Sequence, residues 1–406
     1  MWLKLGSSRT RASAIGRCNI HSGWHVKPQC LVKSEETGPT STIYISLLLV
    51  LIIPVPSSIV FAFASFRGSI QDRIRVLSQL VHLFSYNIEL NTTVTMTFNT
   101  EKDIGDLSGK VILITGGNAG IGKATVEALV PHNPAAIYIC ARNLETAKAV
   151  VEDVRKSTPD ANIEVLQLDL SSLESVKSCA SAFNSKANRL DILFLNAGVS
   201  SVSPRLSKEG YEIEFAINHM GHALLTQLLL PKMLQTKQKD PTADLRVVST
   251  SSMAYTASPG GKIDVSQMSD PHAFGWRPLA RYGHSKLANI LFIRKLAERY
   301  PDINCTAVHP GVVKSEIFER AKAEGSRLLY WLTAPVIMLT GVTTEEGAKT
   351  QLWAATAKDV ESGKFYVPVG KPVDNAVFHD AEQVDGLWKY TEEELAKHGA
   401  SGWPSA

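Results

Sequence analysis

From residue 110 onward, short apolar runs rich in β-branched residues alternate with segments whose apolar residues recur at helical spacing. Apolar runs of this length between helices are typical of buried strands in a parallel sheet that helices cover on both faces. We therefore predict an α/β fold: a doubly wound, Rossmann-type parallel sheet of about seven strands with helices on both faces. The predicted strands are 111–115, 136–140, 163–168, 191–195, 246–250, 303–309 and 364–368.

A glycine-rich turn, TGGNAGIG over 115–122, joins the first predicted strand to the first predicted helix. Gly116 permits a tight turn, Gly120 permits close approach of the backbone to a ligand, and Gly122 permits the helix to pack on the sheet. The start of that helix offers free N–H groups and a favourable dipole to a pyrophosphate. Glycines also serve plain loops, but the flanking strand and helix favour a dinucleotide site here.

The end of the second predicted strand bears on the choice of cofactor. An acidic residue there binds the ribose hydroxyls of NAD, but this sequence reads Ala141-Arg142-Asn143. A guanidinium at this position suits a 2′-phosphate, which favours NADP(H) over NAD. The alternative is a solvent-exposed arginine that opens a helix.

A tyrosine and a lysine, Tyr282 and Lys286, lie four residues apart on a helix predicted over 280–299. This spacing puts the phenol and the ammonium on one face. A nearby cation favours the phenolate, so the pair is suited to acid/base work on a carbonyl or an alcohol. Such pairs also occur by chance on ordinary helices.

Two further polar residues belong to the same candidate site. Ser252 follows the strand 246–250, at the carboxyl edge where ligands bind in such sheets, although a helix N-cap would explain it equally. Asn218 lies in a predicted long helical stretch, 211–235, among apolar neighbours rather than on a polar face.

In their order along the chain, these motifs resemble the short-chain dehydrogenase/reductase family over about residues 107–370. The resemblance implies an active-site tetrad of Asn218, Ser252, Tyr282 and Lys286. It also implies that the cofactor is bound by Tyr282 and Lys286 and by Gly116, Asn118, Gly120, Ile121, Gly122, Arg142, Asp169, Leu170, Asn196, Ala197, Gly198, Val313 and Ser315. Ser315, in HPGVVKS over 309–315, stands where the family usually has threonine.

The resemblance also implies a mechanism. Hydride passes between the nicotinamide and a carbonyl carbon, while Tyr282 protonates the forming alkoxide. Lys286 holds the nicotinamide ribose and lowers the Tyr282 pKa, Ser252 hydrogen-bonds the substrate oxygen, and Asn218 holds a water that relays protons to Lys286.

The spacing of Ser252 and Tyr282, together with NHMGH and YGHSKLAN, is similar to the retinol dehydrogenase and WW-domain oxidoreductase branch of the family. That branch implies an apolar carbonyl or alcohol substrate, resembling a retinoid, a steroid or a secondary metabolite. A homodimer is a further expectation. Two other functions stay open: a non-catalytic NADP(H)-binding regulator that senses redox state, and a membrane scaffold.

Residues 1–95 differ in composition from the rest, with nine Lys/Arg against four Asp/Glu. We divide this region into a basic polar tail (1–39), an uncharged apolar run long enough for one membrane span (40–66), and the start of a linker (67–106). With residues 1–95 present, we expect a single-pass membrane anchor and a cytoplasmic catalytic domain. If translation starts at Met96, we expect a cytoplasmic protein.

Outside that region the chain is nearly neutral, with 33 Lys/Arg against 35 Asp/Glu, and offers no basic face for nucleic acid. No spacing of His and Cys predicts a metal site. We expect the apolar stretch 315–340 to form a substrate lid, with ordinary core packing or subunit packing as the alternative. Residues 371–406 are predicted as a C-terminal tail.

Overall fold

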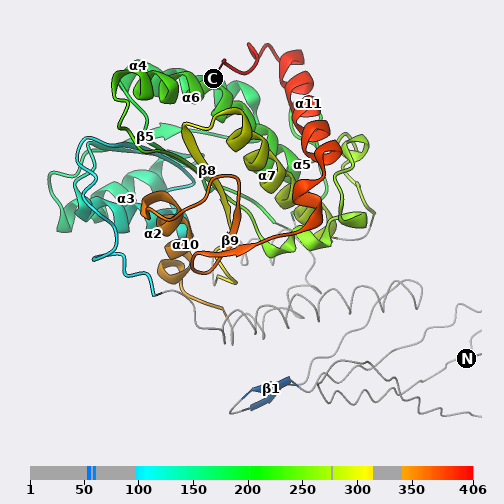
Figure 1. Cartoon of the computed structure of the whole chain (residues 1–406), viewed down its shortest axis with the longest axis horizontal. Coiled ribbons are helices and arrows are strands. Elements are labelled where there is room, and N and C mark those ends of the chain that lie inside the picture. The colour runs from blue at the N-terminus through cyan, green and yellow to red at the C-terminus, as the bar shows by residue number, and fades with distance from the viewer. Residues whose placement is uncertain are drawn as a thin grey trace, which may run out of the picture. The chain divides into compact units, whose positions relative to one another are not determined.

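The computed structural model describes residues 97–200, 202–275, 278–313 and 341–405, and two short strands near the N-terminus (Figure 1). Those strands, β1 (Ile53–Val55) and β2 (Ser58–Val60), pair antiparallel. They lie within the apolar run 40–66, and the predicted membrane span there stays a prediction. The tail 1–39 and the remainder of the run lie outside the described residues. Among the helices that the structure describes, none has the length and apolar character to cross a bilayer.

The main sheet of the described chain has eight strands in the order β10-β9-β8-β7-β6-β3-β4-β5. The chain enters at β3, runs outward to β5, and returns to β6 on the other side of β3, which creates a topological switch point. Every neighbouring pair is parallel except β9 and β10. The strands are β3 (Val111–Thr115), β4 (Ala136–Ala141), β5 (Ile163–Gln167), β6 (Ile192–Leu195), β7 (Leu245–Thr250), β8 (Ile303–Val308), β9 (Phe365–Val367) and β10 (Lys371–Val373).

Seven parallel strands thus lie within one residue of their predicted bounds, and the prediction missed β10. This strand has three residues, one of them a proline, and lies at the edge of the sheet. Proline is tolerated at a sheet edge because no neighbouring strand there needs its missing N–H.

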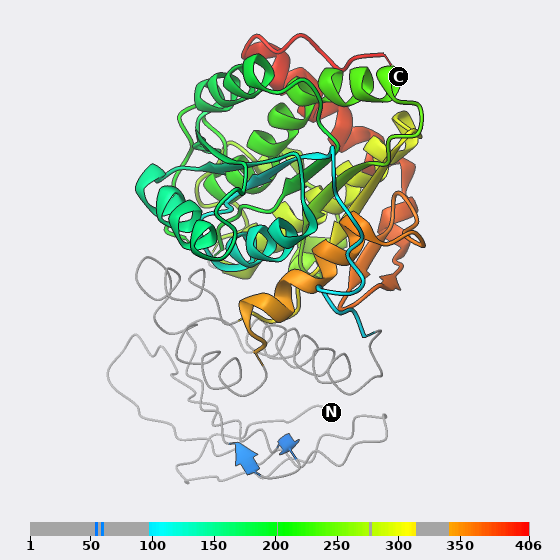
Figure 2. The same ribbon diagram turned by 90° about the vertical axis from the view of Figure 1, so that its left-hand side faces the viewer.

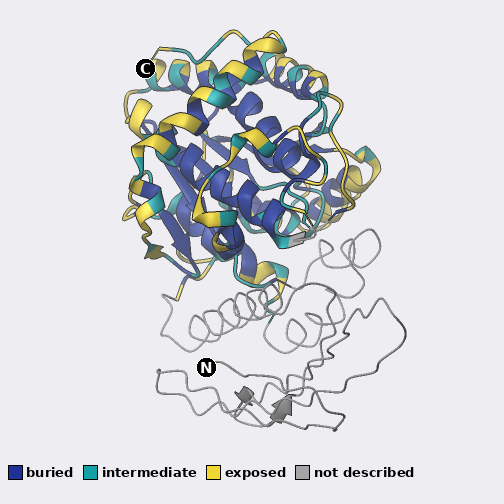
Figure 3. Cartoon of the chain, turned by 90° about the vertical axis from the view of Figure 1, so that its right-hand side faces the viewer, coloured by how far each residue is buried: buried dark blue, intermediate teal, exposed yellow. Residues whose placement is uncertain are grey.

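Helices cover both faces of the sheet (Figures 1 and 2). Successive residues of β3 point to opposite layers: Leu113 belongs to one hydrophobic cluster, whereas Ile112 and Ile114 belong to the other. Buried residues line the sheet and the inner sides of the helices, and exposed residues lie on the outer sides (Figure 3). The helices are α2 (Gly120–Leu129), α3 (Leu144–Ser157), α4 (Leu173–Lys186), α5 (Ile213–Phe215), α6 (Gly221–Lys239), α7 (Pro278–Arg299), α10 (Thr344–Thr356) and α11 (Ala381–Lys397).

Shorter helical turns complete this part of the chain. They are η1 (Val130–His132), the π-helical turn η2 (Ala216–Met220), η3 (Met253–Ala257), η4 (Pro259–Gly261), η5 (Val265–Gln267) and η6 (Ala376–His379).

The predicted C-terminal tail, 371–406, is part of the folded domain and needs correction. It contains β10 and α11, and α11 lies along α7 (Figure 1). The Trp388 ring stacks on Phe292 at 5.6 Å between centroids, and the Arg299 guanidinium lies 5.2 Å from the Trp388 ring. Burial of this aromatic surface fixes the helix against its neighbour.

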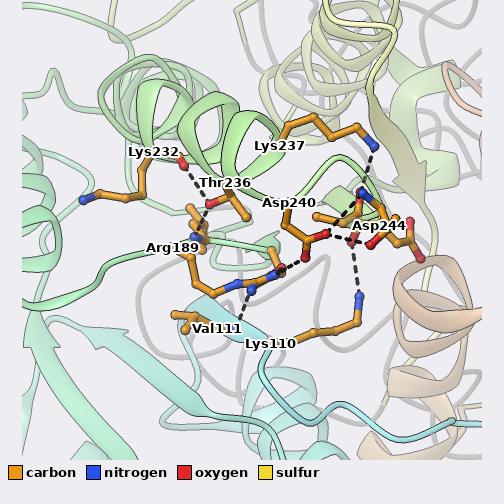
Figure 4. A network of polar contacts seen from close by, with 12 residues as sticks. Lys110, Val111, Arg189, Lys232, Thr236, Lys237, Asp240 and Asp244 are labelled. Carbon is orange, nitrogen blue, oxygen red and sulfur yellow. Dashed lines mark hydrogen bonds and ion pairs between the residues drawn. The ribbon is translucent and has the colours of Figure 1, made fainter.

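A polar network lies at the amino-terminal edge of the strands (Figure 4). The fully buried Asp191 carboxylate accepts hydrogen bonds from Val111 N at 2.8 Å and from Arg189 Nε at 2.9 Å. Arg189 also reaches Asp240 at 3.5 Å, and Lys110 Nζ donates to the Asp244 carbonyl at 3.3 Å. These charges neutralise one another at the edge opposite the predicted site.

Candidate active site

The glycine-rich turn has the geometry that a phosphate-cradling loop requires. Gly116 and Gly120 have φ of +69° and +53°, a region in which glycine is favoured. A Cβ on Gly122 would clash with the backbone oxygen of Gly116, so only glycine lets α2 begin against the turn. The N-cap of α2 is Ala119, whose side chain caps no N–H group, and the first helical turn has no acidic residue. The first N–H groups of α2 therefore lack a side-chain cap and suit an anion.

Asn118 connects this turn to the loop after β4. Its amide donates to Thr146 Oγ1 at 2.9 Å, and Thr146 lies in the first turn of α3. Asn143 caps the same helix by accepting from the N–H groups of Glu145 and Thr146. Arg142, just before the cap, is exposed, and its guanidinium forms no ion pair with any residue that the structure describes.

The loop after β6 is fastened to the glycine-rich turn through Thr115. The N–H groups of Asn196 and Ala197 donate to Thr115 Oγ1 at 2.9 and 3.0 Å, and Asn196 Nδ2 donates to the Thr115 carbonyl at 2.9 Å. Gly198 follows, where a Cβ would lie 3.1 Å from Asn218 Oδ1 and 3.4 Å from Lys286 Nζ. The predicted NAG motif therefore lies between the turn and the predicted tetrad.

Asp169 and Leu170 follow the end of β5. The Asp169 carboxylate accepts from Ser171 N at 2.9 Å and from Ser171 Oγ at 2.6 Å. The carbonyl of Leu170 lies so close to Gly221 that a Cβ there would contact it. The absence of a side chain at Gly221 thus allows α6 to begin against this segment.

Tyr282 and Lys286 share one face of α7, with the Lys286 ammonium 5.5 Å from the centre of the tyrosine ring. Lys286 is buried, and its Nζ donates to the carbonyl of Thr250, the last residue of β7, at 2.8 Å. Burial disfavours the ammonium and lowers the pKa of Lys286 to about 8, although the negative charge of Glu214 acts in the opposite direction.

The pKa of Tyr282 lies above its ordinary value. Burial raises it to about 12, a hydrogen bond with Ser252 lowers it, and the charge of Glu214 raises it further. The pKa rises on balance because loss of hydration outweighs the Ser252 hydrogen bond, and a lowering by Lys286 stays a prediction.

Ser252 caps a helical turn and also contacts the predicted acid/base residue. Its Oγ accepts from Ala254 N at 3.1 Å as the N-cap of η3, and the same side chain contacts the Tyr282 phenol. Gly283 allows this approach, since a Cβ there would clash with the carbonyl of Ala254. The glycine of YGHSK thus brings η3 and Ser252 against the tyrosine.

Asn218 lies in the π-helical turn η2, which interrupts the long helix predicted over 211–235. Its Oδ1 accepts from Val199 N at 2.8 Å, and its Nδ2 donates to Val199 O and to Ser285 Oγ at 2.9 Å each. The side-chain amide is thus occupied by protein partners, and the water that the resemblance assigns to Asn218 stays a prediction. Its backbone carbonyl could hold a water, although His222 also contacts that oxygen at 3.1 Å.

His222 is a site residue that the sequence analysis missed. Its Nε2 lies 2.9 Å from Thr115 Oγ1, and burial lowers its pKa to about 4, so the ring is neutral at pH 7. With Nδ1 donating to the Asn218 carbonyl, Nε2 accepts from the Thr115 hydroxyl. The available signal was the second histidine of NHMGH, one helical turn after Asn218.

The chain is similar in sequence to a known family of enzymes. The family model for short chain dehydrogenases matches residues 110–325, more than half of the chain. The chain is 35% identical over 293 residues to retinol dehydrogenase 12 of Mus musculus, covering 71% of this chain and 87% of that protein.

The chain is a short-chain dehydrogenase/reductase. It belongs to the retinol dehydrogenase-like branch, which confirms the family predicted from the motifs. This short-chain dehydrogenase/reductase is also 33% identical over 320 residues to an uncharacterised oxidoreductase of Schizosaccharomyces pombe, covering 77% of this chain and 92% of that protein. A solved structure of a Mycobacterium paratuberculosis protein superposes with a TM-score of 0.56 at 25% identity, covering 74% of this chain and 97% of that one. Family membership makes the protein an oxidoreductase that uses NAD(P)(H).

Two predicted cofactor-binding residues of this short-chain dehydrogenase/reductase lie after β8. Val313 forms a parallel bridge with Val342, and Gly347 of α10 leaves room for the side chains of Val313 and Ile121. Ser315 and the apolar stretch 315–340 lie outside the described residues. In the described part of the chain, no group of three or more His, Cys, Asp or Glu side chains is arranged to hold a metal ion.

Proposed function

We propose that the protein interconverts a carbonyl and a primary or secondary alcohol on an apolar small molecule, with NADP(H) as cofactor and Tyr282 as the acid/base. The observation that carries this proposal is the arrangement around Tyr282. Its phenol contacts Ser252, and the Lys286 ammonium lies 5.5 Å from its ring. Ser252 and the Lys286 ammonium lie near the end of β7, at the carboxyl edge of the sheet. At the same edge, β3 leads into the glycine-rich turn.

The bound cofactor would supply or accept the hydride, and the protein would manage one proton. With a pKa of about 12, Tyr282 carries its proton at pH 7 and can donate it to the alkoxide that forms during reduction. The Lys286 ammonium, fixed by the Thr250 carbonyl, stabilises the phenolate that remains. The Ser252 hydroxyl orients the substrate oxygen, and Asn218 holds the loop at Val199 in place.

The residues present fit NADP(H). The uncapped start of α2 and the turn at Gly122 suit the pyrophosphate, and the exposed Arg142 suits a 2′-phosphate. Asn118 joins the two regions through Thr146, which supports a role at the same phosphate. We also propose that Asp169, Leu170, the NAG motif and Val313 contact the cofactor, because each follows the end of a strand at the carboxyl edge of the sheet.

An apolar substrate is favoured by the similarity to retinol dehydrogenase 12, whose name denotes action on a retinoid. A steroid or a secondary metabolite with a similar apolar body would meet the same description. A membrane anchor, a cytoplasmic location and a homodimer stay predictions of the sequence.

The test is a panel of apolar aldehydes and ketones, including retinal and steroid ketones, assayed by loss of NADPH absorbance. We expect turnover by the wild type and a loss of about 10²–10⁴-fold in kcat for Tyr282→Phe. NADPH affinity should be nearly unchanged, because the variant keeps the turn, Arg142 and Lys286. A folded Tyr282→Phe protein with full activity would contradict the proposed mechanism. NADPH binding by the wild type without turnover of any compound would favour the redox-sensing regulator.

A further inference from the structure

A buried polar chain runs from the glycine-rich turn to Lys286 through a single side chain of α10, that of Gln351. Gln351 Nε2 donates to Thr125 Oγ1, and Thr125 Oγ1 donates to the Ile121 carbonyl at 2.8 Å. On its other side, Gln351 Oε1 accepts from Thr250 Oγ1 at 3.0 Å. Gln351 is 1% exposed and Thr125 is fully buried, so water cannot replace these partners.

The second end of this chain is the ammonium of Lys286. Its Nζ donates to the Thr250 carbonyl, and this is the one hydrogen bond that Nζ makes among the described residues. Thr250 also ends β7, so its position fixes where Ser252 begins η3. One residue, Thr250, is therefore held by Gln351 through its hydroxyl and holds Lys286 through its carbonyl.

The directions of the hydrogen bonds in this chain are defined. The Gln351 amide has one accepting and one donating end, so the Thr250 hydroxyl must donate to it and the Thr125 hydroxyl must accept from it. A helix that served only to cover the sheet would need no such side chain. Thr350, adjacent on α10 and equally buried, has a hydroxyl with no hydrogen-bond partner among the residues that the structure describes. The polar link to the two site elements is thus particular to Gln351.

We propose that Gln351 is a positioning residue, which sets the Lys286 ammonium and the glycine-rich turn in register through Thr250 and Thr125. This role rests on the proposed function of the site. Through these contacts, Gln351 of α10 would fix the position of the bound cofactor relative to the acid/base pair. Misplacement of reacting groups by about 1 Å can cost up to about 10²-fold in rate.

The test avoids leaving buried hydroxyls without partners. A triple variant, Thr125→Val/Thr250→Val/Gln351→Met, replaces the side-chain partners by apolar groups of similar size, a change that can be nearly neutral for folding. The matched control is Thr350→Val, which removes a buried hydroxyl from the same helix outside the network. Thermal unfolding, NADPH affinity by fluorescence titration, and the pH dependence of kcat are measured on the full chain. The carbonyl compound is the one from the panel above that the wild type reduces fastest.

We expect the triple variant to fold, to bind NADPH about threefold to tenfold more weakly, and to lose about tenfold in kcat. The apparent pKa in its pH profile should also move, which a purely structural role would not cause. The control should match the wild type in all three readouts. If a folded triple variant keeps the wild-type NADPH affinity, kcat and pH profile, the proposed role of Gln351 is overturned, while the proposed function is not. The same holds if the variant changes thermal unfolding and neither NADPH affinity nor kcat. Failure of the wild type to bind NADPH or reduce any panel compound would instead contradict the proposed function on which this inference rests.

Discussion

Nε2 of His222 lies 2.9 Å from Oγ1 of Thr115, which joins the turn around Asn218 to the strand that leads into the glycine-rich loop. The Thr115 oxygen also receives the N–H groups of Asn196 and Ala197. The imidazole thus supports two segments of the proposed cofactor site at once.

Replacing His222 should affect both folding and cofactor binding. His222→Leu removes the hydrogen bonds to Thr115 and Asn218, and we expect a loss of about 1–3 kcal/mol in the free energy of unfolding. NADPH affinity should fall by about tenfold, which corresponds to ~1.4 kcal/mol. The control is His219→Leu, since His219 is equally buried but bonds to Thr391 on α11. It should lower stability and leave NADPH affinity unchanged; equal affinity losses in the two variants would count against the role of His222.

Four buried histidines predict that the protein loses stability in mild acid. Burial lowers their pKa values, to about 3 for His219 and His309 and to about 4 for His222 and His284. In the unfolded chain each titrates near ~6.5, so below that pH the unfolded state takes up protons first. Stability should therefore be full above about pH 6.5 and decrease as the pH falls toward these lowered values, as measured by urea unfolding at pH 7, 6 and 5.

His309 offers a clean variant for this test, since neither ring nitrogen has a hydrogen-bond partner in the described part of the chain. His309→Phe should flatten the acid dependence by up to about 1.4 kcal/mol per pH unit below pH 6.5. An unchanged slope in this variant would show that His309 does not contribute to the acid sensitivity.

The lowered pKa of Lys286 predicts an alkaline limit to carbonyl reduction. Because this pKa is about 8, kcat/KM should fall as the ammonium loses its proton above about pH 8. Lys286→Met should lower activity and abolish this limb. Lys295→Met, on the same helix but paired with Glu298 and Asp385, should retain it. A limb at the same pH in Lys286→Met would assign the ionisation to another group.

The polar network at the amino-terminal edge predicts unequal effects for two aspartates that share Arg189. Asp191 is fully buried, so Asp191→Ala should cost about 1–3 kcal/mol by leaving the Val111 N–H without its partner, whereas the Arg189 guanidinium is 33% exposed and keeps Asp240. Asp240 is 38% exposed, and Asp240→Ala should cost less than about 1 kcal/mol. Urea unfolding measures both, and similar losses would contradict the assignment of the buried pair.

Arg142 predicts a preference between the two cofactors. Arg142→Asp replaces the cation proposed for the 2′-phosphate by a carboxylate, which repels a phosphate and suits free ribose hydroxyls. We expect the KM for NADPH to rise at least about tenfold while the KM for NADH stays equal or falls. A wild type that already prefers NADH would refute the assignment of Arg142.

The features that could be predicted from the sequence are those that depend on residues close together in the chain. The run VILIT and the glycines that follow determine β3 and the turn locally, and YGHSK sets the Tyr282–Lys286 pair by helical spacing. Gln351 meets Thr125 across 226 residues, so no local pattern reveals their contact. The raised pKa of Tyr282 likewise depends on burial by distant elements.

The C-terminal prediction failed for a related reason. Val384, Leu387, Trp388 and Leu395 are buried on one side of α11, and residues distant in sequence, such as Phe292 of α7, cover that side. Polar residues between them made the segment resemble a solvated tail. Likewise, β10 is only three residues long, and it is a strand because it pairs with β9.

The packing of α11 on α7 has a consequence for synthesis. The helix that carries Tyr282 and Lys286 lies well before the end of the chain, yet its outer side is closed by residues near the C-terminus, where Tyr300 Oη also donates to the Pro404 carbonyl at 2.6 Å. The ribosome must therefore release α11 before Trp388 can shield Phe292 from water. Until then the nascent chain exposes an aromatic surface of the kind that chaperones bind, so the helix that carries the proposed acid/base pair matures only after a segment made about a hundred residues later.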